Sequence, residues 1–135
     1  MSKGPDNSVE KMDNDETLTV LFADDDAALR GPLAAFLRKQ GFHVLEAEDG
    51  NEALEVARKY DGPIHLLVSD ILMPNMDGTA VAALLSAARP EMRILLISGF
   101  ADDLVCQKDW AFMRKPFRAQ ELLAAVQSVL GRNGA

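Results

Sequence analysis

The stretch from Ile64 to Gly78 constrains the fold of this chain more than any other part of the sequence. It begins as an apolar run that is too short to span a membrane and has the length of a buried strand. The run ends on one carboxylate, Asp70, and a turn sequence rich in Pro, Asn, Asp and Gly follows at once. In open parallel α/β sheets, ligands bind at the carboxyl ends of the strands. Asp70 is therefore a metal ligand, a nucleophile or a helix cap.

Length and charge narrow the class of protein. The chain has 135 residues and 48% hydrophobic residues, which suits one globular domain. We expect the domain to span residues 17–131, between a polar tail over 1–16 and a short tail over 132–135. The net charge of −7 argues against binding to nucleic acid or to an anionic membrane surface. The single cysteine, Cys106, cannot form an internal disulfide, which favours a location in the reducing cytoplasm. We expect Cys106 to be a small residue of the core.

Apolar runs and amphipathic segments alternate along the chain. This order predicts a flavodoxin-like α/β fold, a doubly wound parallel sheet of five strands in the order 2-1-3-4-5. The expected strands are Leu18–Ala23, His43–Ala47, Ile64–Asp70, Met92–Ile97 and Ala111–Arg114. The first expected helix begins after Asp26 and ends at Gly41, with Pro32 inside it. Three further helices are expected over Asn51–Tyr60, Thr79–Ala88 and Ala119–Leu130, and a weak, short one over Ala101–Asp109.

Five polar side chains stand at the ends of these strands and fall on one edge of the predicted sheet. The first strand ends at Asp24 and Asp25, the third at Asp70, the fourth at Ser98 and the fifth at Lys115. Three carboxylates in one place cannot all ionise cheaply unless a cation lies among them. Oxygen ligands favour a hard ion such as Mg²⁺. A metal beside a carboxylate, with an ammonium and a hydroxyl, is typical of phosphoryl transfer, with Asp70 as the nucleophile.

Each of these residues also has a plain structural interpretation. Asp26 is expected to be a helix cap, and Asp24 and Asp25 taken alone are ordinary loop acids. Ser98 alone is a turn residue and Lys115 alone a surface lysine. His43 and His65 are expected to flank strands at the surface. The functional interpretation depends on all five strand-end residues sharing one edge.

The sequence resembles the receiver domains of bacterial two-component response regulators. The resemblance is carried by LFADDD at 21–26, LVSDILMPNMDG at 67–78, LISG at 96–99 and RKPF at 114–117. It extends from about Leu18 to Leu130. It implies that Asp70 accepts a phosphoryl group from a phosphohistidine on a sensor histidine kinase or a histidine phosphotransfer protein.

The resemblance also implies a role for each matching residue. Asp25 and Asp70 would bind Mg²⁺ together with the backbone carbonyl of Leu72, and Asp24 would act through a metal-bound water. Ser98 would hydrogen-bond one phosphoryl oxygen and Lys115 would pair with another. Pro116 would follow a cis peptide bond, and Phe112 would be the aromatic residue that moves when Ser98 moves.

The segment between Ser98 and Lys115 is shorter than is usual in this family. We therefore expect a shortened fourth helix, as in receivers attached to hybrid sensor kinases, and doubt the family's usual dimer. Trp110 is either a lid over this segment or an exposed contact for a partner. The apolar residues Leu72 and Phe100 flank the acceptor site and are expected to shield the phosphate from water.

Two rival functions use the same residues. A Mg²⁺-dependent phosphatase would need a second acid two residues after the nucleophile, where this chain has Leu72. A purely structural interaction module would not bind Mg²⁺, although all five site residues are present. The favoured interpretation is a phosphoacceptor switch that phosphorylates and dephosphorylates only itself, without direct contact to nucleic acid or membrane.

Overall fold

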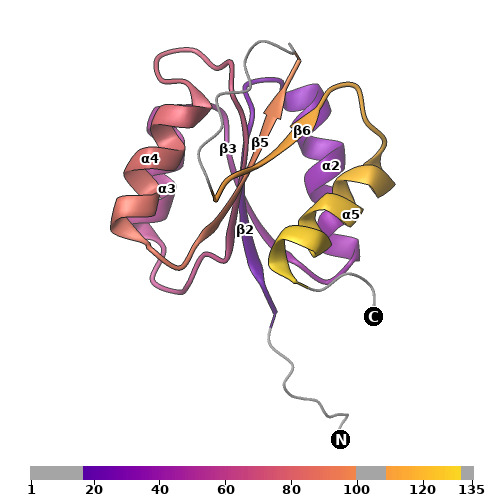
Figure 1. The fold of residues 1–135 in the computed structure, drawn as a ribbon, viewed down its shortest axis with the longest axis horizontal. Helices are drawn as coiled ribbons and strands as arrows, with labels where there is room; N and C mark the ends of the chain where they lie inside the picture. The colour runs from indigo at the N-terminus through magenta and orange to yellow at the C-terminus, as the bar shows by residue number, and fades with distance from the viewer. Residues whose placement is uncertain (1–16, 100–108, 132–135) are drawn as a thin grey trace, which may run out of the picture.

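A single parallel sheet forms the centre of the molecule. The computed structural model describes residues 17–99 and 109–131. Its strands are β2 (Thr19–Ala23), β3 (His43–Ala47), β4 (Leu66–Asp70), β5 (Arg93–Ser98) and β6 (Ala111–Arg114). They lie in the order β3-β2-β4-β5-β6, and every neighbouring pair is parallel (Figure 1). The predicted fold class and strand order, 2-1-3-4-5, are confirmed.

Four helices in the described part of the chain cover both faces of this sheet. Helices α3 (Gly50–Lys59) and α4 (Gly78–Ala88) lie on one face, and α2 (Ala27–Lys39) and α5 (Ala119–Leu130) lie on the other (Figure 1). None of these helices has the length and apolar character needed to cross a membrane.

Alternate residues of each strand enter two separate cores. Leu21, Leu67 and Leu96 pack with the α3–α4 layer, and their chain neighbours Phe22 and Val68 pack with the α2–α5 layer. All five residues are fully buried. A strand that is buried on both faces needs apolar residues at successive positions, which explains the continuous apolar runs in the sequence.

Local sequence signals set the ends of the helices. The Asp26 side chain accepts hydrogen bonds from the N–H groups of Ala28 and Leu29, so the expected cap of α2 is confirmed. Gly41 follows the end of α2 at φ 101°, a left-handed conformation that favours glycine. Pro32 lies inside α2, as expected.

Several predicted boundaries were wrong by one or two residues. Helices α3 and α4 each begin one residue earlier than expected, at Gly50 and Gly78, and β5 runs from Arg93 to Ser98. Hydrogen bonding decides such ends, and a pattern of apolar residues locates them only approximately. Several predictions lie outside the described residues: the two tails, the roles of Phe100 and Cys106, and the helix over 101–109 except for residue 109.

The two histidines differ in their surroundings. His43 is exposed, as expected. His65 is half-buried, and its Nδ1 accepts a hydrogen bond of 2.8 Å from the backbone N–H of Thr19. His65 therefore helps to hold the start of β2 beside β4.

Arg89 ties the end of α4 to the end of α3. Its guanidinium donates to the backbone carbonyls of Ala57 and Tyr60, both at 2.9 Å, and to that of Gly62 at 3.0 Å. The last carbonyls of a helix have no partner within the helix, so these bonds satisfy groups that would otherwise need water. One side chain thus joins the two helices on this face of the sheet.

Replacing this side chain should loosen the α3–α4 layer. We expect Arg89→Met to lower the free energy of unfolding by about 2–3 kcal/mol, because three carbonyls lose a charged donor. Arg58→Met is the matched control, since Arg58 is exposed and its ion pair in the described part of the chain is with Glu55 on its own helix. It should cost at most about 0.5 kcal/mol. Urea unfolding followed by circular dichroism measures both, and equal effects would contradict the assignment.

Candidate functional site

Three carboxylates meet at the carboxyl ends of two neighbouring strands. Asp24 and Asp25 follow β2, and Asp70 is the last residue of β4, which pairs directly with β2. Each residue offers a carboxylate oxygen, and the three oxygens lie within 4.8 Å of one another. The predicted convergence of Asp24, Asp25 and Asp70 is therefore confirmed. We call these three residues the acidic cluster.

Lys115 brings a positive charge to the acidic cluster from the far edge of the sheet. Its Nζ lies 3.2 Å from Asp70 Oδ2 and 3.9 Å from Asp24 Oδ2. The backbone N–H of Lys115 donates to the carbonyl of Ser98 at 2.8 Å, which continues the β5–β6 pairing up to the site. One ammonium against three carboxylates leaves an excess of negative charge.

Burial makes this charge expensive. Asp24 is fully buried, and burial is the main cause that raises the pKa of its carboxyl above the ordinary value. Burial also raises the pKa of Asp70, although the hydrogen bond and the charge of Lys115 act in the opposite direction. The folded chain therefore resists full ionisation of its acidic cluster unless further positive charge is supplied.

Asp24 shows that the acidic cluster fits a divalent cation. Its Oδ1 accepts a hydrogen bond of 2.9 Å from the N–H of Asp26. Its Oδ2 is buried and has no hydrogen-bond partner, the one such side-chain atom in the described part of the chain. A buried carboxylate oxygen without a donor is costly unless a cation binds it. A set of carboxylate oxygens is the donor set that Mg²⁺ prefers.

The remaining predicted residues lie around this edge of the sheet. Ser98 is buried and is the last residue of β5, one step beyond the Asp70–Ile97 pair. Phe112 lies on β6 opposite Leu96 and packs against the α3–α4 core. The Leu72 side chain is 52% exposed. The peptide bond before Pro116 is cis, as the resemblance implied. The switching role of Phe112 and the shielding role of Leu72 stay predictions.

Gly78 allows α4 to begin against the backbone of Asp70. A Cβ at position 78 would lie 2.2 Å from the carbonyl oxygen of Asp70. The N–H of Gly78 donates to the carbonyl of Ile71 at 2.8 Å, which closes the turn after β4. The sequence indicates only a turn at this glycine, and its close approach to Asp70 arises from the folded backbone.

Sequence reasoning missed Arg30 altogether. Its guanidinium donates to the backbone carbonyl of Asp24 and also pairs with Glu46 on β3. No spacing rule links these three positions, because they come from a loop, a helix and a neighbouring strand.

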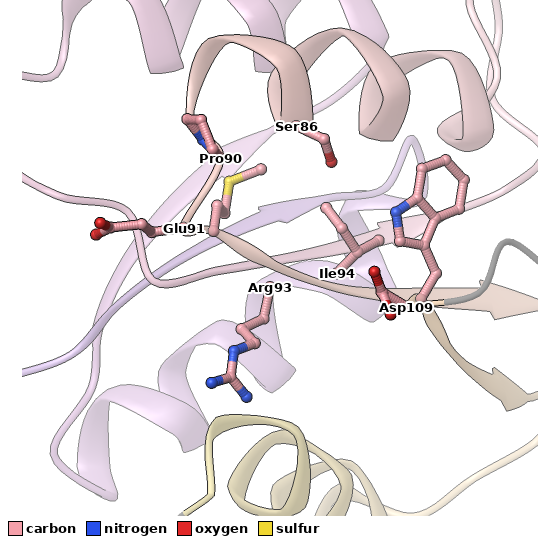
Figure 2. Close-up of a pocket in the computed structure, with 8 residues that line it drawn as sticks. Ser86, Pro90, Glu91, Arg93, Ile94 and Asp109 are labelled. Atoms are coloured by element: carbon pink, nitrogen blue, oxygen red, sulfur yellow. The ribbon is translucent and has the colours of Figure 1, made fainter.

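Trp110 lies far from the acidic cluster, at the amino ends of β5 and β6. It is half-buried against the α3–α4 core and lines a cavity of about 490 Å³. Ser86 on α4, Ile94 and Asp109 also line this cavity, and Figure 2 shows Ser86 above Ile94 and Asp109. Whether Trp110 covers the shortened segment is not tested, because residues 100–108 lie outside the described part of the chain.

Comparison with known proteins connects this geometry to one family. The family described as response regulator receiver domain matches residues 20–127. The response regulator receiver protein CpdR of Brucella abortus (strain 2308) is 34% identical over 116 residues, which cover 82% of this chain and 95% of CpdR. The sensor kinase CckA of the same strain is 33% identical over 117 residues, which cover 83% of this chain and only 12% of that kinase.

Solved structures show the same likeness. The receiver domain of the hybrid histidine kinase CckA superposes with a TM-score of 0.74 at 34% identity, over 83% of this chain and 98% of that domain. The response regulator TrrA from Thermotoga maritima, in complex with Mg²⁺ and BeF, superposes with a TM-score of 0.73 at 27% identity. That match covers 84% of this chain and 99% of TrrA.

The close approach at Gly78 can be tested by adding one methyl group. We expect Gly78→Ala to lower the free energy of unfolding by about 2–3 kcal/mol, because the new Cβ overlaps the Asp70 backbone. Gly31→Ala is the control, since a Cβ at position 31 in α2 meets nothing within 4 Å. It should raise stability by roughly 0.5–1 kcal/mol. Thermal unfolding measures both, and a Gly78→Ala variant as stable as the wild type would refute the contact.

The raised pKa of Asp24 predicts a stabilising substitution. A carboxyl whose pKa is higher in the folded than in the unfolded protein binds its proton more tightly after folding. The stability gained from this tighter proton binding is therefore lost as the pH rises from the pKa of the unfolded protein through the raised pKa of the folded protein. Without Mg²⁺ at pH 7, Asp24→Asn should raise the free energy of unfolding by on the order of 1 kcal/mol. The gain should shrink in acid.

Asp77→Asn provides a control of opposite sign. Asp77 caps α4, and its hydrogen bonds from the Thr79 hydroxyl and the Ala80 N–H lower its pKa. Its charged form therefore favours folding, and the substitution should lower stability at pH 7. Urea titrations at several pH values measure both variants. A loss of stability in Asp24→Asn at neutral pH would contradict the interpretation of the acidic cluster.

Proposed function

The chain belongs to the response regulator receiver domain family of two-component systems, and we propose that Asp70 is its phosphoacceptor. The donor is a phosphohistidine on a sensor histidine kinase or on a histidine phosphotransfer protein. The observation that carries the proposal is the acidic cluster itself, in which Asp70 lies beside two further carboxylates and the ammonium of Lys115. The relatives include both a receiver protein and a sensor kinase, so the output partner stays open.

The transfer needs one bond to form and one to break. A carboxylate oxygen of Asp70 attacks phosphorus, and the bond between phosphorus and the imidazole nitrogen breaks with its electrons left on that nitrogen. Lys115 lies 3.2 Å from Asp70 Oδ2 and is placed to pair with a phosphoryl oxygen. Ser98, at the end of β5, would hydrogen-bond another. Both contacts stabilise charge on the phosphoryl group as it moves.

A Mg²⁺ ion would be held by Asp25 and Asp70 together with the backbone carbonyl of Leu72. Asp24 would act through a water molecule on the metal, which gives its buried Oδ2 a partner. When bound, the ion neutralises negative charge on the carboxylates and the phosphoryl oxygens. The complex of the similar protein TrrA with Mg²⁺ and BeF supports this part of the proposal.

Phosphorylation would then alter the neighbouring strands. A phosphoryl group adds one to two negative charges at a niche that already holds Lys115. Ser98 would move towards the phosphate, and Phe112 would turn inwards behind it. A partner protein would bind the changed surface. We propose that this exchange takes place in the cytoplasm.

The chemistry that we propose ends with transfer to Asp70 and loss of the phosphate to water. A phosphatase of the rival kind would place an acid two residues after Asp70. That position holds Leu72, which has no proton to give a leaving group. Turnover of small phosphate esters is therefore not expected.

Incubation with acetyl phosphate and Mg²⁺ tests the proposal directly. We expect a mass increase of one phosphoryl group in the wild type, no increase in Asp70→Asn, and a greatly reduced one in Asp25→Asn. Asp26→Asn is the matched control, because Asp26 belongs to the same acidic run but caps α2. It should be phosphorylated like the wild type. Mass spectrometry provides the measurement.

Three outcomes would overturn the proposal. Absence of a mass increase in the wild type would remove the phosphoacceptor role. Steady hydrolysis of para-nitrophenyl phosphate, lost in Asp70→Asn, would instead favour the phosphatase. Failure of the wild type to bind Mg²⁺ would favour the structural module.

A further inference from the structure

We propose that Arg30 is a positioning residue that holds Asp24 in the geometry needed for the divalent cation. This inference rests on the proposed Mg²⁺ site and adds a residue outside the acidic cluster to it. Arg30 lies on α2, on the side of the sheet away from α3 and α4 (Figure 1). It does not belong to any of the sequence motifs that carry the resemblance.

Every polar group of Asp24 except one has a hydrogen-bond partner within the fold. Its N–H donates to the carbonyl of Ala47 at 3.0 Å, and its Oδ1 accepts from the N–H of Asp26. Its backbone carbonyl accepts from Nη1 of Arg30. These three contacts fix the residue on both sides of its Cα. Oδ2 alone is left without a hydrogen bond, and it lies 3.9 Å from Nζ of Lys115, the ammonium that also pairs with Asp70.

Arg30 is itself held rigidly. Its Nε pairs with Glu46 Oε1 at 2.9 Å, and its side chain is only 13% exposed. The guanidinium is a planar group whose donors have fixed directions, so a bond on one edge orients the donor on the other. Glu46 lies on β3, the strand that pairs with β2. The chain of contacts therefore runs from β3 through α2 to the end of β2.

The contact of Arg30 with Asp24 opposes the electrostatic repulsion within the acidic cluster. The three carboxylates repel one another, Lys115 offsets only part of this repulsion, and a shift of the loop after β2 would relieve it. Holding the carbonyl of Asp24 prevents that movement. The cation then meets carboxylates that are already in place, and binding does not have to reorder them. Partners behind metal ligands typically contribute about 10–100-fold to metal affinity.

Arg38 offers a matched control on the same helix. Its guanidinium lies 3.2 Å from Glu46 Oε2 and donates to the carbonyl of Val44 at 2.7 Å. It thus shares the carboxylate partner of Arg30 and also bonds a backbone carbonyl. Its hydrogen bond and ion pair go to Val44 and Glu46, and not to Asp24. Loss of Arg38 should disturb the packing of α2 against β3 without releasing the site.

The experiment compares Mg²⁺ binding in four proteins. Isothermal titration calorimetry gives the dissociation constant of Mg²⁺ for the wild type, Arg30→Met, Arg30→Lys and Arg38→Met. We expect about 10-fold weaker binding in Arg30→Met and less than 2-fold weaker binding in Arg38→Met. Arg30→Lys keeps one donor and should fall between the wild type and Arg30→Met. Thermal unfolding without Mg²⁺ measures the purely structural cost of each substitution.

The outcomes separate this inference from the proposed function. If the wild type does not bind Mg²⁺, the proposed metal site is wrong. If the wild type binds and both methionine variants bind equally well, or weaken in proportion to their loss of stability, Arg30 has only a structural role. Should Arg30→Met fail to fold, Arg30→Lys against Arg38→Met decides the matter, and an unchanged affinity in Arg30→Lys overturns the inference.

Discussion

The mutual repulsion of three carboxylates is the constraint on which the rest of this structure depends. Two adjacent strands bring one carboxylate oxygen each of Asp24, Asp25 and Asp70 within 4.8 Å of one another, and Asp24 is fully buried. Lys115 offsets only part of their charge. Burial raises the pKa of both Asp24 and Asp70, so the folded chain carries a free-energy cost for ionising these carboxyls.

The scaffold resists this repulsion through backbone contacts. The N–H of Asp24 is bonded to β3 and its carbonyl to Arg30 on α2, so it cannot drift outwards freely. Asp70 is held by the pairing of β4 with β5 and by the close start of α4 at Gly78. Lys115 follows β6, whose register with β5 delivers its ammonium to the site. Backbone contacts of the sheet and of helices α2 and α4 thus position three charged side chains, those of Asp24, Asp70 and Lys115.

Sequence reasoning recovered most of the fold because its main signals are local. Continuous apolar runs predicted strands that are buried on both faces, and the two cores formed by Leu21 and Phe22 on their opposite sides confirm this. Asp26 and Gly41 predicted the two ends of α2, and the structure places its bounds within two residues of them. The half-buried state of His65 was missed, because its contact with Thr19 depends on strand pairing between distant segments.

The sequence by itself determined which charged residues stand at the carboxyl ends of the strands, because the alternation of strands and helices places those ends on one edge. Only the tertiary structure decided how these residues are held there. Arg30 bonds both Asp24 and Glu46, and Gly78 lies against the backbone of Asp70. These contacts join segments that no sequence spacing relates. The physical reason is that a hydrogen bond or a close packing contact depends on ångström-scale positions, which arise only when the whole sheet and its helices have assembled.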